Sequence, residues 1–251
     1  MKLAIIGGSG LAALAELEGV RRQVVRTPYG DPSAPLFRGS LGGIDLVFLA
    51  RHGTGHTIAP HEVNYLANLW ALKHAPVEGV VAVASVGGIA AGLRPGTLVI
   101  PDQIIDYTTA RRNTYFEGPD QPVNHVDFTW PYDERLRDCL ARAADEVGRG
   151  VVRGGTYGCA QGPRLETAAE VARMERDGCT MVGMTGMPEA VLARELGLPY
   201  ATLAVVANHA AGRGDSGETV SLEAISETLE HTMGRVRKIL QRTARLAAEL
   251  G

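Results

Sequence analysis

Cysteine is scarce in this chain, and neither sign of charge is in large excess. The 251 residues include only Cys139, Cys159 and Cys179, which are odd in number, widely spaced and free of any CxxC pair. This pattern excludes a disulfide framework and a zinc ribbon, and it favours buried, unreactive thiols in a reducing cytoplasm. A formal net charge of −3 provides no basic surface, so we expect no nucleic-acid partner.

Long hydrophobic runs are lacking as well. The apolar stretch Met1–Ile6 meets Gly7 too early to form a signal peptide. No stretch approaches the length of a membrane span. We therefore expect a cytoplasmic chain that makes no contact with a membrane.

Apolar residues and glycine, in contrast, are plentiful. Hydrophobic residues make up 45% of the chain and glycine occupies 31 positions, enough for a large core with many tight turns. No repeat or linker divides the sequence, so residues 1–251 are expected to form one α/β domain. Apolar runs, several of them continuous, predict strands covered on both faces at Leu3–Ile6, Leu46–Leu49, Val80–Ala84, Leu98–Ile105, Met181–Val182 and Tyr200–Ala207.

Helical spacing and capping residues separate many of these strands. They predict helices at Asn64–His74, Glu134–Val147 after an Asp133 cap, Thr167–Asp177, Pro188–Leu196 and Ser221–Leu250. Residues 23–49 are typical of a hairpin or meander. The expected architecture is therefore a single mixed central sheet flanked by helices.

A glycine-rich turn follows the first predicted strand. Residues 8–13 match the dinucleotide fingerprint G-x-G-x-x-A. That fingerprint needs an acid about twenty residues further on. Here Gln23–Thr27 contains none, and strand-like sequence continues in place of a crossover. A phosphate cradle of backbone amides and the Ser9 hydroxyl is favoured over dinucleotide binding, with a purely structural turn as the other alternative.

Polar residues also follow the strand that ends near Ala50. Arg51 offers a planar fork that suits phosphate, and His52 adds a donor. Together with His56 and His61, His52 could form a metal cluster. Without nearby Cys or a clear carboxylate partner, we expect no metal, and a solvated loop is the remaining alternative.

Two further strand ends carry small or polar residues. The turn at Ala84–Ser85, before Gly87 and Gly88, could add amides to an anion site or could simply reverse the chain. Asn208 ends a continuous apolar strand, where its amide could read the edge of a base or could cap its own turn.

Residues 158–190 contain two turns broken by Gly and Pro, each opening a helix. They bring Arg164, Glu166, Met184 and Thr185 into one short stretch. Helix starts favour anions, so a carboxylate at one of them suggests a ligand with an anionic part and a donor-rich part. A solvated Glu at the start of a helix is the alternative for Glu166.

Taken in order and spacing, four motifs resemble the trimeric purine nucleoside phosphorylase and methylthioadenosine phosphorylase family over essentially the whole chain. They are Gly7-Gly8-Ser9-Gly10, Arg51-His52-Gly53, Gly162-Pro163-Arg164 and Met184-Thr185-Gly186-Met187-Pro188-Glu189. The resemblance implies phosphorolysis, in which phosphate displaces a purine from C1′ of a nucleoside. Phosphate is then a co-substrate and no cofactor is expected.

The resemblance also assigns roles to individual residues. It places phosphate at Ser9, Arg51, His52 and Thr185, near the Ala84–Ser85 turn, and the ribose on Met184. Relatives often carry a hydroxyl or an amide where Ala84 stands, so one phosphate contact is expected to be missing or moved. Arg51, His52 and Asn208 are the expected catalytic residues, with Leu165 beside the base.

Three positions depart from the adenine-specific members of the family. These members carry Asp where this chain has Asn208 and Ala210, and a small hydroxyl residue where it has Glu166. Glu166 matches the carboxylate that accepts N1–H of hypoxanthine or guanine. The resemblance therefore implies a 6-oxopurine nucleoside.

The expected sugar pocket is apolar at its 5′ end. Leu222 and Ile225 match the wall of a methylthio pocket, although packing of an amphipathic helix is an alternative. His125 matches a residue that a neighbouring subunit contributes. The resemblance thus points to 5′-methylthioinosine and to a homotrimer or a dimer of trimers.

Four other functions are also compatible with the sequence. They are a general inosine and guanosine phosphorylase, a methylthioadenosine phosphorylase, an NAD(P)-dependent oxidoreductase that uses the first glycine-rich turn, and a nucleoside-binding protein without catalysis.

Overall fold

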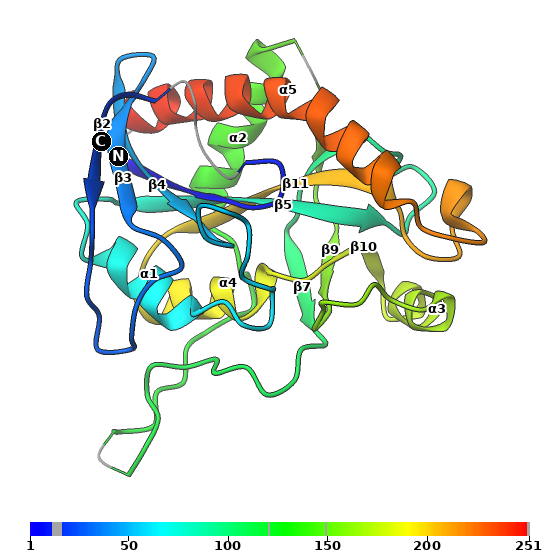
Figure 1. The fold of residues 1–251 in the computed structure, drawn as a ribbon, viewed down its shortest axis with the longest axis horizontal. Helices are drawn as coiled ribbons and strands as arrows, with labels where there is room; N and C mark the ends of the chain where they lie inside the picture. Colours follow the sequence, from blue (N-terminus) through cyan, green and yellow to red (C-terminus); the bar gives the residue numbers. More distant parts are fainter. Residues whose placement is uncertain (12–16, 120, 149, 250–251) are drawn as a thin grey trace.

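The computed structural model describes residues 1–11, 17–119, 121–148 and 150–249. Its strands form one mixed sheet in the order β2–β3–β4–β1–β5–β10–β9–β7, with β11, β6 and β8 branching from β5 (Figure 1). The bounds are β1 Leu3–Gly7, β2 Glu18–Gln23, β3 Leu36–Leu41, β4 Ile44–Ala50, β5 Gly79–Gly88, β6 Leu98–Ile100, β7 Gln103–Asp106, β8 Val152–Arg153, β9 Thr156–Cys159, β10 Cys179–Gly183 and β11 Tyr200–His209.

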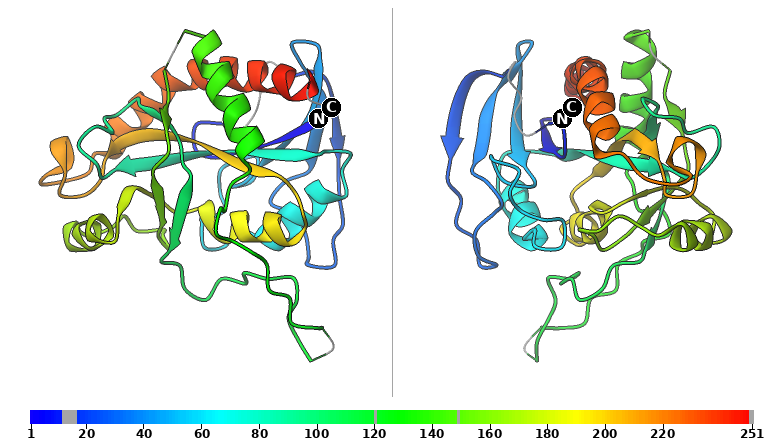
Figure 2. Two further views of the ribbon diagram at one scale, coloured as in Figure 1. Left: turned by 180° about the vertical axis from the view of Figure 1, so that it is seen from behind. Right: turned by 45° about the vertical axis from the view of Figure 1, so that its right-hand side comes forward.

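Helices cover both faces of this sheet, as the sequence predicted. In Figures 1 and 2, α2 (Glu134–Glu146) and α5 (Leu222–Glu249) lie on one face, and α1 (Tyr65–Lys73) and α4 (Gly186–Glu195) lie on the other. Helix α3 (Ala168–Arg176) packs beside β10, and a 3-10 turn, η1 (Gly214–Ser216), follows β11. The expected mixed sheet flanked by helices is confirmed.

The centre of the sheet is parallel, and this decides where a ligand can bind. Strand β1 runs parallel to β4 and β5, and β5 runs parallel to β11. Near its carboxyl end, β5 also pairs with β10, which runs in the opposite direction. The carboxyl ends of β1, β4, β5 and β11 therefore meet at one edge, the usual place for a ligand in an α/β fold.

The capping residues correctly predicted where the helices begin. Asn64 caps α1 and Asp133 caps α2, each accepting a hydrogen bond from an amide three residues on. The capping box of Thr167 and Glu170 is present at the start of α3. These side chains satisfy amides that would otherwise lack partners at a helix start, which is why the predicted boundaries agree closely with the structure.

The strand predictions need three corrections. The run Leu98–Ile105 is two strands, because Pro101 cannot donate to a ladder, and β6 and β7 pair with different neighbours. Residues 24–27, which looked strand-like, lie beyond the end of β2. Strand β2 was not predicted, because all six of its residues are exposed and no buried apolar run marks it. Strands β8 and β9 were not predicted either, because they are very short.

The segment between β7 and α2, described for residues 107–119 and 121–133, includes a loop that extends away from the body of the molecule (Figures 1 and 2). His125, in this segment, is exposed. Met1 lies beside the end of α5, where its amino group donates to the Ala247 carbonyl at 2.9 Å. Within the described residues, every helix is too short or too polar to span a bilayer.

Candidate active site

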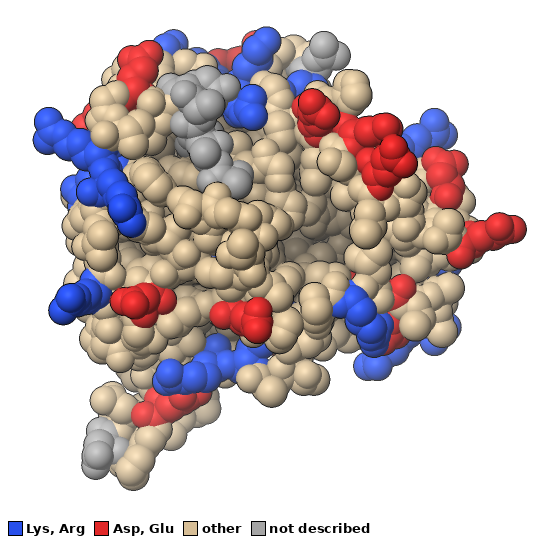
Figure 3. Space-filling view, in the orientation of Figure 1, with Lys and Arg blue, Asp and Glu red and all other residues tan. Residues whose placement is uncertain are grey.

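A cavity of about 470 Å³ opens at the edge where the parallel strands end. Figure 3 shows it as a hollow whose visible lining is uncharged. All but one of the residues to which the resemblance gives a role in binding or catalysis line it together: Ser9, Arg51, His52, Ala84, Ser85, Leu165, Glu166, Met184, Thr185, Asn208, Ala210, Leu222 and Ile225. The exception is His125.

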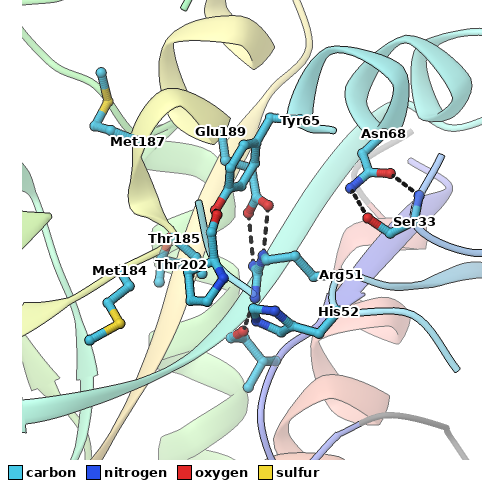
Figure 4. A network of polar contacts seen from close by, with 12 residues as sticks. Ser33, Arg51, His52, Tyr65, Asn68, Met184, Thr185, Met187, Glu189 and Thr202 are labelled. Atoms are coloured by element: carbon cyan, nitrogen blue, oxygen red, sulfur yellow. Dashed lines mark hydrogen bonds and ion pairs between the residues drawn. The ribbon is translucent and has the colours of Figure 1, made fainter. Parts of the chain in front are cut away.

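Arg51 follows β4, and its side chain is only 1% exposed. Its Nε and Nη2 donate to the two carboxylate oxygens of Glu189 at 2.7 and 2.8 Å, and its Nη1 donates to the Val83 carbonyl at 3.0 Å (Figure 4). Burial acts to lower the pKa of Arg51, but the adjacent Glu189 carboxylate more than offsets it, so the pKa is raised. Arg51 stays charged, and one N–H on each terminal nitrogen remains for an anion in the cavity.

Glu189 had no assigned role in the sequence, although it belongs to a quoted motif. It lies on α4 with no exposed surface and also accepts a hydrogen bond from the Tyr200 hydroxyl at 2.8 Å. The sequence feature that could have identified Glu189 is an acidic residue among the apolar residues of a predicted helix. Such an acid is expected to be paired, because burying a lone charge is very unfavourable.

Gly8 lets the Arg51 guanidinium reach the cavity. A Cβ at this position would lie 2.6 Å from the Val83 carbonyl oxygen and 2.8 Å from Nη1 of Arg51, so any other residue would displace one of them. The next residue, Ser9, has its hydroxyl oxygen 3.5 Å from Nε2 of His56. His56, considered from the sequence only as a metal ligand, thus lines the same part of the cavity as Ser9.

His52 is held as a neutral imidazole with a defined tautomer. Its Nδ1 lies 2.8 Å from the Ile58 carbonyl oxygen, which can only accept, so Nδ1 carries the hydrogen. Burial and the neighbouring Arg51 charge lower the pKa of His52 to about 4. At neutral pH its Nε2 therefore has a free lone pair, which can accept the hydrogen of a protonated phosphate oxygen.

This depressed pKa predicts acid sensitivity. We expect the free energy of unfolding to fall as pH drops from the ordinary histidine pKa of 6.5 to about 4, because protons then bind the unfolded state more tightly. The difference between the two pKa values corresponds to about 3 kcal/mol. Urea unfolding at several pH values should show this loss in the wild type and much less of it in His52→Asn, whose amide can still donate to Ile58. An equal pH slope in both proteins would contradict the assignment, and His61→Asn, at an exposed histidine outside the cavity, serves as the control.

Met184 and Thr185 come from the turn between β10 and α4. Both line the cavity with Arg51 and His52, and Figure 4 shows Thr185 nearer to these two residues than Met184. Thr185 is the N-cap residue of α4 but makes no capping hydrogen bond with its side chain, so its hydroxyl is available to a ligand. Ala84 brings no hydrogen-bonding side chain to this end, while Ser85 also lines the cavity.

Glu166 lines the cavity from the loop that precedes α3. Its Oε1 is buried and has no hydrogen-bond partner within the described structure. Burial raises the pKa of this carboxyl group. A buried acceptor without a partner is costly, so the site favours a ligand with a matching donor. The alternative of a solvated helix-start residue does not agree with this burial.

Arg164, which had no assigned contact, anchors the loop that carries Glu166. Its two terminal nitrogens donate to the Glu170 carboxylate at 2.7 and 2.8 Å. The same carboxylate accepts the Thr167 amide in the capping box, and the Arg164 contact helps to lower the pKa of Glu170 to about 2. Arg164 thus fixes the loop against the start of α3.

Asn208 is aimed by an irregularity in β11. The register with β5 shifts between Val206 and Asn208, which leaves Ala207 as an extra residue. Such bulges re-aim the next side chain, and they carry no clear sequence signal. The Asn208 Nδ2 donates to the His209 carbonyl at 2.6 Å, which leaves Oδ1 for a ligand. Ala210 is buried beside it with no polar side-chain group.

The cavity is open where α5 begins. Leu222 is 71% exposed, so packing within the core does not explain it, whereas Ile225 is half-buried and packs against the core. His125 does not line the cavity of its own chain.

Two alternatives can be compared with these observations. Strand β2 pairs antiparallel with β3, and not parallel with β1, so the dinucleotide-binding interpretation of the first turn is wrong; its Ala12 and Ala13 lie outside the described residues. Among the described residues, no group of three or more His, Cys, Asp and Glu side chains is placed to hold a metal ion, and His61 does not join His52 and His56 at the cavity.

Comparison with known proteins agrees with this geometry. Residues 2–245 match the family model described as the phosphorylase superfamily. A probable S-methyl-5′-thioinosine phosphorylase of Xanthomonas campestris is 53% identical over 89% of this chain and 90% of its own length. A 6-oxopurine nucleoside phosphorylase of Pyrococcus furiosus is 42% identical over 95% and 90%. A methylthioadenosine phosphorylase of Schistosoma mansoni, solved with adenine, is 34% identical and superposes with a TM-score of 0.91 over 99% and 92%. The chain is therefore an enzyme of the phosphorylase superfamily.

Proposed function

We propose that this enzyme cleaves 5′-methylthioinosine with phosphate to give hypoxanthine and 5-methylthioribose 1-phosphate, a purine salvage reaction. The observation that carries the proposal is the buried, unpartnered Oε1 of Glu166 at the base end of the cavity. Hypoxanthine offers a hydrogen at N1 to such an acceptor, whereas adenine has none there. Relatives named as S-methyl-5′-thioinosine and 6-oxopurine nucleoside phosphorylases support the same choice.

The reaction follows from charge placed at the two ends of the nucleoside. A phosphate oxygen forms a bond to C1′ while the C1′–N9 bond breaks and its electron pair moves into the purine. The transition state resembles an oxocarbenium ion, positive on the sugar and negative on the base. Arg51, His52, Ser9 and Thr185 hold phosphate for attack, and the bound anion offsets the sugar's positive charge.

Asn208 acts on the leaving base in this proposal. The second hydrogen of its Nδ2 donates to N7 or O6 of the departing purine. This contact strengthens as negative charge develops on the base, which is the condition for catalysis. Leu165 and Ala210 border the base, Met184 packs under the ribose, and Leu222 and Ile225 face the methylthio group.

The sugar pocket is proposed to be completed by a second copy of the chain. Leu222 is left exposed, and His125 is exposed in the segment between β7 and α2, part of which extends away from the body. A homotrimer, or a dimer of trimers, would bring His125 of one subunit to the cavity of the next. The proposed location is the cytoplasm, because the three cysteines are buried and unpaired.

Steady-state assays with 5′-methylthioinosine, inosine and 5′-methylthioadenosine test the proposal. We expect phosphate-dependent base release, with the highest kcat/KM for 5′-methylthioinosine. A preference of tenfold or so over inosine is expected, because the extra apolar contact of a methylthio group contributes about 1–3 kcal/mol. Equal rates with inosine would favour the alternative, a general 6-oxopurine nucleoside phosphorylase. Adenine release as the fastest reaction would contradict the roles given to Glu166 and Asn208.

A further inference from the structure

Arg111, in the segment that leads away from β7, joins the two loops that carry Glu166 and Thr185 to the cavity. Its Nη1 donates to the carbonyl oxygens of Met184 and Met187 at 2.8 and 2.6 Å. Its Nη2 donates to the Gln161 carbonyl at 2.6 Å, and its Nε donates to Oε1 of Gln161 at 3.1 Å. One guanidinium group thus holds both backbones.

These two backbones carry different parts of the proposed site. The Met184 carbonyl belongs to the turn that supplies Met184 and Thr185 to the ribose and phosphate. Gln161 begins the loop that leads to Glu166 at the base. The loops approach closely at Gly162, where a Cβ would lie 2.6 Å from the Met184 sulfur. Arg111 does not line the cavity, so it can act only through the loops.

The shape of arginine matters for these contacts. A planar fork presents donors on both terminal nitrogens and on Nε, and here each direction meets a different acceptor. A lysine ammonium has three donors on one atom and cannot reach both loops in this way. The guanidinium also lies over the Tyr65 ring, 5.5 Å from its centroid, which fixes its plane from α1.

The backbone next to Arg111 is constrained as well. Ala110 has φ of +57°, in the left-handed region that residues with a Cβ rarely adopt. Such a conformation is kept only where neighbouring contacts hold the backbone in place, and the hydrogen bonds of the adjacent Arg111 are such contacts.

We propose that Arg111 is a positioning residue that sets the base-binding loop and the phosphate-binding turn relative to each other. This inference rests on the proposed function, because it concerns the same cavity. The base binds to one loop and phosphate binds to the other, whereas the transition state needs both loops in the correct relative position. Loss of Arg111 therefore lowers kcat more than it raises either KM.

The test compares Arg111→Ala and Arg111→Lys with Arg112→Ala, which removes the adjacent, exposed ion pair to Glu117. We expect kcat for the preferred nucleoside to fall about 100-fold in both Arg111 variants, as for a displacement of about 1 Å at a reacting centre, with both KM values nearly unchanged. Added ethylguanidinium should restore much of the kcat of Arg111→Ala, while ethylammonium should not. Arg112→Ala should behave as the wild type.

Full kcat in Arg111→Lys would overturn the inference even if Arg111→Ala failed to fold. Equal rescue by ammonium, or a rise in KM alone, would also overturn it. The wild-type enzyme measured alongside keeps the two proposals apart. Its substrate preference tests the proposed function, and the ratio of variant to wild-type kcat on whichever nucleoside it cleaves tests Arg111.

Discussion

Replacing Glu166 by glutamine is expected to lower kcat/KM for 5′-methylthioinosine by about 10- to 150-fold. A hydrogen bond to a charged group contributes about 1.5–3 kcal/mol, and the amide keeps the shape of the side chain while removing its charge. For 5′-methylthioadenosine no such loss is expected, since adenine has no N1–H and the amide can donate to N1. The ratio of the two kcat/KM values is therefore the quantity to measure.

The pH dependence gives an independent check of the same residue. Burial raises the pKa of Glu166, and only the ionised form accepts N1–H at full strength. In the wild type, kcat/KM for 5′-methylthioinosine should fall on the acid side at a pH above the ordinary glutamate pKa of 4.5. In Glu166→Gln this limb should disappear, leaving the titration of His52 near pH 4.

Stability separates this effect from damage to the fold. A raised pKa means that the folded state disfavours the ionised carboxyl group, so Glu166→Gln should be at least as stable as the wild type at neutral pH. Glu230→Gln, at an exposed position on α5, is the matched control. It should change neither the ratio of the kcat/KM values for the two nucleosides nor the free energy of unfolding. An unchanged substrate ratio in Glu166→Gln would remove the main argument for a 6-oxopurine.

Much of the fold was predictable because its signals are local. Asn64, Asp133 and the Thr167–Glu170 box mark helix starts by hydrogen bonds that span three residues. Continuous apolar runs revealed the buried strands β1, β4, β5 and β11. Strand β2 escaped prediction because hydrogen bonds to β3 hold it at the sheet edge and none of its side chains is buried.

The site was predictable only where a residue touches the proposed ligand. Arg51, His52 and Glu166 stand at strand ends or helix starts, where sequence patterns point to ligands. Glu189 and Arg111 act through other protein groups 138 and about 50–75 positions away in the chain, so no local pattern reveals their partners. The bulge before Asn208 is likewise set by the pairing of β11 with β5.

Replacing Glu189 by alanine is expected to have the largest effect on stability of any single change considered. It would leave the 1%-exposed Arg51 guanidinium without its carboxylate and the Tyr200 hydroxyl without its acceptor. Breaking a buried pair in this way costs about 3–5 kcal/mol. In a chain of this size that lowers the melting temperature by roughly 6–20 °C. Calorimetry or urea unfolding of the purified variant measures it.

A double variant tests whether the cost arises from the unpaired charge or from packing around it. If the charge is responsible, Arg51→Met combined with Glu189→Leu should be more stable than Glu189→Ala, because neither partner remains to be left buried alone. The double variant should nevertheless lose phosphorolysis, since it lacks the guanidinium proposed to hold phosphate. A double variant as unstable as Glu189→Ala would assign the loss to packing. Recovered stability with lost activity would mean that the buried pair serves chiefly to keep a charged arginine at the phosphate end of the cavity.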